Sequence, residues 1–459
     1  MKYCFLAIDI GTTFVKSALL RLEERRMEDI RRFPTPTNED SDREIYEIPM
    51  DRLASLLRKE IERRDRENPL DGVVMSLQMH GMMLWDEENR PLTDYRTWTD
   101  GRAGIPDETG MSAVAHLESL LGLETFRTTG MRLNPSHTAA QLHSVRKEYA
   151  DRAVRLSMLG DGVTELLTGA AAPVHDTNAQ SSTMYDVVTG DWREDIVSAI
   201  GLPKLRLPEI SHGTEPAGMM EVNGHEVAIY AAVGDQQASI LGAQVRPGEL
   251  MINVATGGQI IWLEKEPHFG DYETRPMIGN LFMRTISDLP AGHCLNTAVD
   301  FLEDIGSRLF GETIPRDKLW SRLLSLVDRL EDADGLESDV HFHTLGSRGE
   351  NAYIRGMTGS NFTFDRWFYS VYEGMAENYY QAYLRIRDDS VQPTNLLGFG
   401  GVMQKTPVFR RILEEKFGLP LRLAENKEDT LTGLMRLAAW YSGLCPDLDS
   451  TLSWLEGEK

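Results

Sequence analysis

The order of apolar and polar positions predicts an α/β protein from the first residues onward. Cys4 to Ile8 and Phe14 to Leu20 are apolar runs of strand length, separated by the polar turn Gly11-Thr12-Thr13. Residues 51–67 carry leucine and isoleucine at helical spacing, with arginines at the solvent positions, which predicts an amphipathic helix. Residues 71–77 form another apolar run, so we expect a strand after that helix.

The rest of the chain continues this alternation, which favours the α/β class. An apolar strand, Val227 to Val233, ends at Gly234-Asp235, and a helix is expected just after it. The chain is expected to close with a strand, a glycine turn, a helix, a strand and a last helix. Other helical patterns lie near 112–121, 138–149, 158–168, 295–309, 317–331 and 366–386.

The second half of the chain opens like the first. Leu250 to Val254 and Gln259 to Leu263 are strand patterns that flank the turn Ala255-Thr256-Gly257-Gly258. This hairpin repeats the N-terminal one at an offset of 244 residues, from Asp9 to Asn253. A strand, a Gly/Thr turn and a strand at the start of each half predict a duplicated fold of two domains, residues 1–238 and 239–459.

Charge and composition narrow the class of function. The chain has 48 Lys and Arg against 71 Asp and Glu, and this net charge of −23 argues against nucleic-acid binding. It has no run of about 18 apolar residues, so no membrane span is expected. The first apolar run ends at Asp9 without a small-residue cleavage site, and the three cysteines are scattered. We expect a cytoplasmic protein with reduced, mostly buried thiols.

Five short motifs could carry chemistry, and the first is Asp9 to Thr13. A turn that follows a strand in this way can present amides and two hydroxyls to phosphate oxygens. Asp9 could hold Mg²⁺ directly or through water, and Lys16 could add a cation. The alternative is an ordinary hairpin turn, in which Asp and Gly are common.

Two further turns are rich in glycine, which allows a close backbone approach to an anion or a planar base. Thr256 and Gly257 belong to the second hairpin, and Gly400-Gly401 lies between a strand and a helix that begins near Thr406-Pro407. Each could be an ordinary tight turn. Two hairpins, one from each half, could however grip a polyphosphate from both sides of a cleft.

Asp235 stands at the end of an apolar strand just before a helix, where α/β proteins place catalytic groups. A carboxylate there can accept the proton of a substrate hydroxyl as its oxygen attacks phosphorus. Such a base typically contributes roughly 10²–10⁴-fold to the rate. The alternative is an aspartate that caps the helix.

The fifth motif combines Gln78 and His80 with Trp98. The first two carry donors and acceptors that suit a polyol, and the indole offers a flat face to a sugar. The alternative for His80 is a hydrogen-bonded interior histidine, and the methionines around it, Met79 among them, favour a core position.

In their order along the chain, these motifs resemble the FGGY carbohydrate kinases over roughly residues 3–440. The resemblance implies a two-domain, actin-like (ribonuclease H-like) duplicated fold with the active site in the cleft between domains. It implies ATP and Mg²⁺ as cofactors, a small-molecule sugar as acceptor and Asp235 as the base. The positions that match the family are Gln78, Met79, His80, Trp98, Asp235 and Gln236 for the sugar, Gly11, Thr12, Thr13, Lys16, Thr256, Gly257, Gly292, Asn296, Gly400 and Gly401 for ATP, and Asp9 for the metal.

Within the family, Arg96 to Arg102, Asn253 to Gln259 and Met277 to Leu302 resemble sedoheptulose kinases most. The expected reaction is phosphorylation of the terminal primary hydroxyl of sedoheptulose, giving sedoheptulose 7-phosphate. Met79-His80 argues against a close likeness to glycerol kinases and fits xylulose- or gluconate-type kinases as well. Many family members have Gly and Ser where Ala255 and Gly257 stand, which puts the nucleotide affinity in doubt.

Functions of other classes stay open at this point. One is a non-catalytic sugar or nucleotide sensor on the same scaffold, since a fold alone does not fix a function. Another is an actin- or chaperone-like ATPase that acts on protein partners. A homodimer is also left open, whereas nucleic-acid and membrane partners are not expected.

Overall fold

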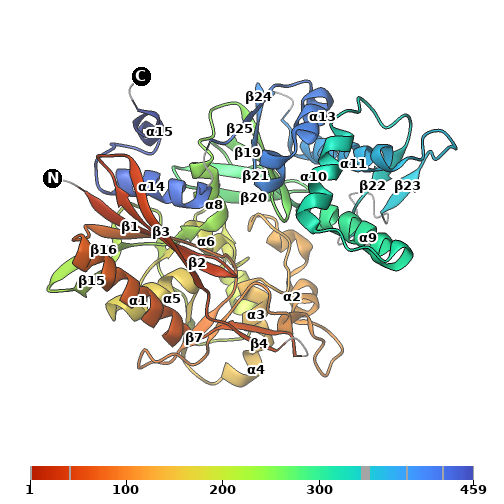
Figure 1. Ribbon diagram of the computed structural model, residues 1–459. Helices are drawn as coiled ribbons and strands as arrows, with labels where there is room; N and C mark the ends of the chain where they lie inside the picture. Colours follow the sequence, from red (N-terminus) through yellow and green to blue (C-terminus); the bar gives the residue numbers. More distant parts are fainter. Residues whose placement is uncertain (1–2, 41–42, 343–351, 389–390, 426–427, 458–459) are drawn as a thin grey trace.

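The protein folds into two α/β halves, each built on one central sheet with helices on both faces (Figure 1). The computed structural model describes residues 3–40, 43–342, 352–388, 391–425 and 428–457. This architecture confirms the expected α/β class. None of the helices in these ranges is long and apolar enough to cross a bilayer. The cysteines, as expected, are buried and unpaired.

The first sheet has seven strands, which run in the order β15 (Pro216–Val222), β16 (His225–Tyr230), β6 (Gly72–Leu77), β1 (Cys4–Ile10), β2 (Phe14–Arg21) and β3 (Arg26–Pro34), with β17 (Val233–Gly234) also paired to β6. β1 is antiparallel to β2 and parallel to β6. Its side chains alternate between two faces. Leu6 and Ile8 pack with α1 (Met50–Glu67) and α5 (Leu159–Thr168), whereas Phe5 and Ala7 belong to a second cluster.

The second sheet repeats this topology in the strands β20 (Glu273–Met277), β21 (Leu281–Leu289), β19 (Gly258–Glu264), β18 (Glu249–Val254), β24 (Asn395–Phe399) and β25 (Leu421–Leu423). β18 is antiparallel to β19 and parallel to β24, as β1 is to its neighbours. Ile252 and Val254 pack with α9 (Gly292–Phe310) and α11 (Phe364–Ile386), whereas Met251 joins the cluster of Phe5 and Ala7. The shared topology confirms the duplicated fold.

Helices α8 (Asp235–Gly242) and α14 (Asp429–Tyr441) cross at a distance that only glycine allows. A Cβ added to Gly242 would lie 1.7 Å from the carbonyl oxygen of Asp429, and one added to Gly433 would lie 1.9 Å from that of Ala238. Both helices contribute to the hydrophobic cluster that contains residues of both sheets. The two halves therefore share one core, in addition to the separate core that each half has.

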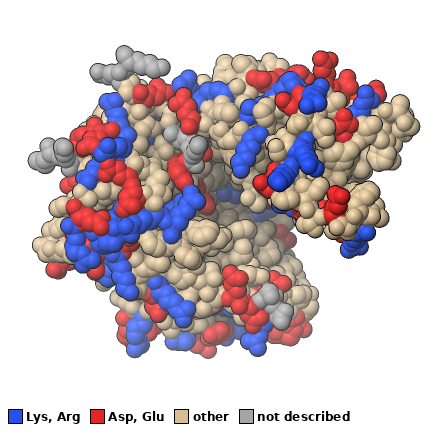
Figure 2. Space-filling view, viewed as in Figure 1, with Lys and Arg blue, Asp and Glu red and all other residues tan. Residues whose placement is uncertain are grey.

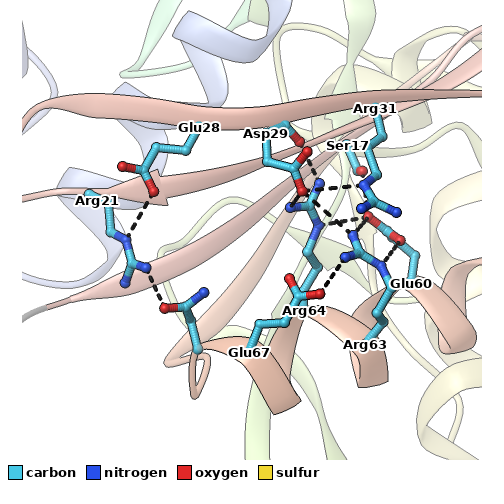
Figure 3. A network of polar contacts seen from close by, with 10 residues as sticks. Ser17, Arg21, Glu28, Asp29, Arg31, Glu60, Arg63, Arg64 and Glu67 are labelled. Atoms are coloured by element: carbon cyan, nitrogen blue, oxygen red, sulfur yellow. Dashed lines mark hydrogen bonds and ion pairs between the residues drawn. The ribbon is translucent and has the colours of Figure 1, made fainter.

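A buried ion network fastens α1 to the edge of the first sheet (Figure 3). Glu60 accepts hydrogen bonds from Ser17 Oγ at 2.8 Å and from Arg64 Nε at 2.7 Å. Arg64 is fully buried and also donates to the carboxylate and the carbonyl of Asp29 on β3. Glu60 also accepts from Arg63 Nη2 at 3.0 Å, so each of the two buried charges has more than one partner of opposite sign.

Two predicted elements differ in extent from those observed. The helix expected over 138–149 is divided into α3 (Thr138–Ser144) and α4 (Arg146–Tyr149). The strand expected over 227–233 is interrupted before β17, because Asn178 Nδ2 donates to the Ala232 carbonyl at 2.7 Å. β24 ends at Phe399, directly before the predicted glycine turn, since Gly400 has a φ of +94°, a conformation that favours glycine.

The remaining elements cover the two sheets or form small sheets beside them: β4 (Asn38–Asp40), β5 (Ile45–Ile48), β7 (Met83–Trp85), β8 (Tyr95–Arg96), η2 (Arg102–Gly104), α2 (Ala113–Leu121), η3 (Leu123–Phe126), β9 (Val154–Ser157), β10 (Val174–His175), α6 (Asp176–Gln180), β11 (Tyr185–Asp186), β12 (Asp191–Trp192), α7 (Glu194–Ala199), β13 (Leu205–Arg206), β14 (Ile210–Ser211), α10 (Arg316–Val327), β22 (Glu337–Asp339), β23 (Tyr353–Arg355), α12 (Gly401–Lys405), α13 (Pro407–Phe417) and α15 (Ser450–Glu456).

We predict that Gly433→Ala separates the crossing helices and lowers the free energy of unfolding by about 2 kcal/mol or more, because the new methyl group has no room beside the Ala238 carbonyl. Calorimetric melting measures the loss as a lower Tm. Gly359→Ala is the matched control, since a Cβ at Gly359 would meet no atom within 4 Å. An equal Tm for the two variants would contradict the close crossing.

Candidate active site

The ends of three neighbouring parallel strands, β1, β6 and β17, meet at one edge of the first sheet. Asp9 lies near the end of β1, Gln78 directly follows β6, and Asp235 directly follows β17. Ligands of open α/β sheets bind at the carboxyl ends of the strands. The topology thus brings together three predicted motifs that are far apart in the sequence.

Thr12 is the point where the first phosphate motif meets the sugar motifs. Its hydroxyl donates to Gln78 Oε1 at 3.4 Å and accepts a hydrogen bond from Trp98 Nε1 at 3.0 Å. Trp98 is 45% exposed, so its indole is fixed by the N–H while much of the ring stays open to a ligand. The hairpin itself is closed by the bond from Gly11 N to the Phe14 carbonyl at 3.1 Å, beside the exposed Thr13.

Asp9 is a buried carboxylate with two polar neighbours. Ser76 Oγ donates to its Oδ1 at 3.0 Å, and Lys16 Nζ lies 3.9 Å from its Oδ2. Burial raises the pKa of Asp9 because the charged form loses its hydration. Lys16 also pairs with Glu428 of the second half at 3.1 Å, so this cation lies between the halves beside the predicted phosphate site.

Asp235 is the first residue of α8 and faces the second half. Loss of hydration, with the nearby charge of Asp9 as the second cause, raises the pKa of Asp235 to about 7. The residue lines a cavity of about 250 Å³ together with Asn253 and Gln259 of the second hairpin and Thr430. A general base is most effective when its pKa lies near the working pH, so both position and pKa suit this role.

Four of the five predicted ATP-binding glycines, all except Gly11, gather around the second hairpin. Gly292 N donates to the Ala255 carbonyl at 3.0 Å, and a Cβ added to Gly400 would lie 2.5 Å from a backbone oxygen of β18. A Cβ at Gly257 or Gly401 would meet no atom within 4 Å, so these two glycines face open space. Gly292 and Gly400 are therefore packed against the backbone, whereas Gly257 and Gly401 are open. This arrangement suits a turn that a flat or anionic ligand approaches closely.

The other predicted nucleotide residues contact this group less directly. The Thr256 carbonyl accepts a hydrogen bond from the backbone N–H of His293 at 3.1 Å, which joins the hairpin turn to the start of α9. Asn296 lies one turn further along α9 and is exposed, and its side-chain oxygen accepts from Arg316 Nη2 at 3.0 Å. A nucleotide contact by Asn296 stays a prediction.

Arg275, on β20 of the second half, reaches the predicted sugar residues of the first half. Its Nη1 donates to Gln236 Oε1 at 2.9 Å and lies 3.9 Å from Met79 Sδ. Its Nε donates to Glu273 at 2.9 Å, and Gln236 Nε2 donates to Gln259 Oε1 at 3.0 Å. Met79 and Gln236 therefore share one buried cation, and that cation is held in turn by the neighbouring carboxylate.

A second and larger cavity of about 940 Å³ lies between the two halves, lined by residues around Gly130 to His137 on one side and by β20 and β21 on the other. The surface is hollowed between the halves on the face shown in Figure 2. Thr274 N donates to the Gly130 carbonyl at 2.8 Å, so the halves are hydrogen-bonded at the cavity wall. Glu273, which binds Arg275, lines this cavity and connects it with the surroundings of Gln236.

Three residues at the site were not predicted from the sequence: Ser76, His137 and Arg275. Ser76 and Arg275 are single polar positions inside strand patterns, so nothing in the sequence distinguished them from ordinary strand residues. His137, which stacks on His80, precedes a predicted helix by one position, and this was the only available signal.

The donor set suits a magnesium ion that is bound largely through phosphate. The described residues contain no group of three or more His, Cys, Asp or Glu that could hold a metal without other ligands. Mg²⁺ usually takes one or two carboxylates, substrate phosphates and waters. Asp9, with the charge of Asp235 nearby, matches that smaller requirement.

Comparisons with known proteins point in the same direction. The family model for the N-terminal domain of the FGGY family of carbohydrate kinases matches residues 4–242. The chain is 24% identical to a glycerol kinase of Gluconobacter oxydans (strain 621H), over 99% of this chain and 90% of that protein. It is 22% identical to a gluconokinase of Bacillus subtilis (strain 168), over 98% of this chain and 90% of that protein.

Solved structures share the fold at low sequence identity. A ligand-bound xylulose kinase from Lactobacillus acidophilus matches with a TM-score of 0.83 at 17% identity, covering 100% of this chain and 93% of that one. The ADP-bound glycerol kinase of Plasmodium falciparum matches with a TM-score of 0.82 at 17% identity, with the same coverage. These neighbours confirm the two-domain actin-like fold.

We predict that Asp235→Asn stabilises the ligand-free protein in a pH-dependent way. The carboxyl has a pKa of about 7 in the folded state against an ordinary value of 3.8, so its ionisation opposes folding as the pH rises through this window. The Tm of the variant relative to the unmodified protein should therefore increase between about pH 4 and pH 7 and then level off. A difference that is constant with pH would contradict the raised pKa.

Proposed function

Since the chain belongs to the FGGY family of carbohydrate kinases, we propose that it uses ATP to phosphorylate the terminal primary hydroxyl of a ketose. The proposed substrate is sedoheptulose and the product sedoheptulose 7-phosphate, with D-xylulose, another pentulose or gluconate as alternatives. The observation that carries the proposal is the position of Asp235, whose side chain faces the second hairpin and has a pKa raised to about 7.

The choice of a long ketose has two supports. The segments Arg96 to Arg102 and Asn253 to Gln259 resemble those of sedoheptulose kinases. The cavity of about 940 Å³ has the volume for a seven-carbon chain, and its wall includes Glu273, which holds Arg275 against Gln236 beside the proposed base.

In the proposed reaction, Asp235 orients the terminal hydroxyl and accepts its proton as the sugar oxygen attacks the γ-phosphorus of ATP in line; the bond from that phosphorus to the bridging oxygen breaks, and ADP leaves. Positioning and electrostatic stabilisation supply most of the catalysis in phosphoryl transfer. The amides and hydroxyls of Thr12, Thr13 and Thr256 stabilise the charge that develops on the phosphoryl oxygens. The domains proposed here, 1–238 and 239–459, close on the substrates and exclude water, which would otherwise compete as nucleophile.

The nucleotide and the metal are proposed to bind between the two hairpins. Gly257 and Gly401 face open space there, and Lys16 and Asp9 lie on the opposite side. Asp9 would hold Mg²⁺ together with phosphate oxygens, and the ion would neutralise charge on the transferred group.

We predict that Asp235→Asn lowers kcat by at least ~10²-fold with little change in the KM for sugar, because the amide keeps the shape but cannot accept the proton. Coupled ADP release under saturating MgATP measures the effect. Thr430→Ser, a mild change at another wall of the same small cavity, serves as the control. A variant that retains most of its turnover would remove Asp235 from the role of base.

The substrate is tested by coupled ADP release with MgATP and sedoheptulose, D-xylulose, D-ribulose, L-ribulose, gluconate, glycerol or no sugar. We expect the highest kcat/KM with sedoheptulose. A higher value for a pentulose or for gluconate would correct the substrate and keep the kinase. Sugar binding by calorimetry without any sugar-dependent ADP release would contradict the proposed reaction.

A further inference from the structure

Two imidazoles lie face to face beside the proposed sugar site. The rings of His80 and His137 have centroids 4.7 Å apart and planes inclined by 16°. His80 follows β6 with a φ of +66°, and its backbone N–H donates to Ser181 Oγ at 3.0 Å. His137 comes from a different segment, directly before α3. The fold therefore assembles the pair from two segments, one that follows β6 and one that precedes α3.

Both rings are kept neutral by their surroundings. Burial lowers the pKa of His80 to about 4 and that of His137 well below its usual value, and the nearby charge of Arg275 acts in the same direction on both. A neutral imidazole has one N–H donor and one acceptor nitrogen. His80 Nδ1 lies 2.8 Å from the Ser181 carbonyl oxygen, which can only accept, so the hydrogen is on Nδ1 and His80 Nε2 is an acceptor.

His137 has no hydrogen-bond partner for its ring among the described residues, although it is only 6% exposed. Its Nδ1 is closed off from solvent, so Nε2 is the nitrogen that can reach a ligand. A hydrogen on the enclosed Nδ1 would be a buried donor without an acceptor, which is unfavourable, so we assign the hydrogen of the neutral ring to Nε2. The residue lines the cavity of about 940 Å³ together with Asn134 and Glu273.

We propose that His137 is a sugar-binding residue that determines specificity: its Nε2–H donates to the carbonyl oxygen of the ketose, while His80 Nε2 accepts from the neighbouring hydroxyl. This inference rests on the proposed kinase function and adds to it a reason for preferring ketoses. A 2-ketose has a carbonyl oxygen, which can only accept a hydrogen bond, next to a hydroxyl group, which can donate one. The donor His137 Nε2–H beside the acceptor His80 Nε2 is complementary to this pair of groups.

The test compares His137→Phe, which keeps a stacking ring without hydrogen-bonding atoms, with His137→Gln, which keeps a donor. We expect His137→Phe to raise the KM for the preferred ketose at least tenfold while the KM for ATP changes less than twofold, and His137→Gln to recover most of the loss. His116→Phe, a histidine on α2 outside the cavity, is the matched control.

A substrate analogue in which the carbonyl is replaced by CH₂ tests the hydrogen bond itself. It should lower kcat/KM at least tenfold with the unmodified enzyme and cause no further loss with His137→Phe. If His137→Phe does not melt as a folded protein, the analogue with the unmodified enzyme decides alone, and an unchanged kcat/KM overturns the inference.

The outcomes separate this inference from the function on which it rests. Sugar-dependent ADP release with an unchanged sugar KM in His137→Phe would overturn the role of His137 alone. An equal loss in His137→Phe and His137→Gln would also overturn it, because the donor would then make no difference. Absence of sugar-dependent ADP release in the unmodified protein would overturn the proposed function and, with it, this inference.

Discussion

The close crossing of α8 and α14 is the constraint on which the rest of the structure depends. Gly242 and Gly433 let the two backbones approach within a distance that any side chain would prevent. α8 begins with the proposed base, and α14 comes from the end of the chain yet packs against β1 and β6 of the first sheet. The position of the base relative to both hairpins is therefore set by this contact between helices, and only secondarily by the loops around the site.

The site places two carboxylates, Asp9 and Asp235, near each other where both lose hydration, which is unfavourable for folding. Burial raises the pKa of Asp9, and loss of hydration together with the nearby charge of Asp9 raises the pKa of Asp235 to about 7. A cationic ligand or a proton reduces the free-energy cost of these charges. Without either, the two carboxylates lower the stability of the folded protein. Such a conflict between stability and local charge is typical of functional sites. Buried Glu60 and Arg64 show the opposite arrangement, in which paired charges serve only to join α1 to its sheet.

Local sequence patterns predicted the parts of the fold that depend on local rules. The two hairpins, α1, β6, α8 and α9 follow from alternation, helical spacing and turn residues, and the echo between Asp9 and Asn253 predicted the duplication. The interruption before β17 depends on a distant partner, Asn178, which no local pattern contains. Ser76, Arg275 and His137 joined the site for the same reason: strands and loops far apart in the sequence place them there.

The alternation of side chains in β1 and β18 has a consequence for how the two halves can change in evolution. Leu6 and Ile8 point into a core that belongs to one half, whereas Phe5 and Ala7 point into the core that also receives Met251 of the other half. A substitution on the first kind of face is compensated by neighbours within the same half. A substitution on the second kind must be matched across the whole chain. The two copies of a duplicated fold can therefore change independently at positions that face the core of one half. At positions that face the shared core, a change in one copy requires a matching change in the other.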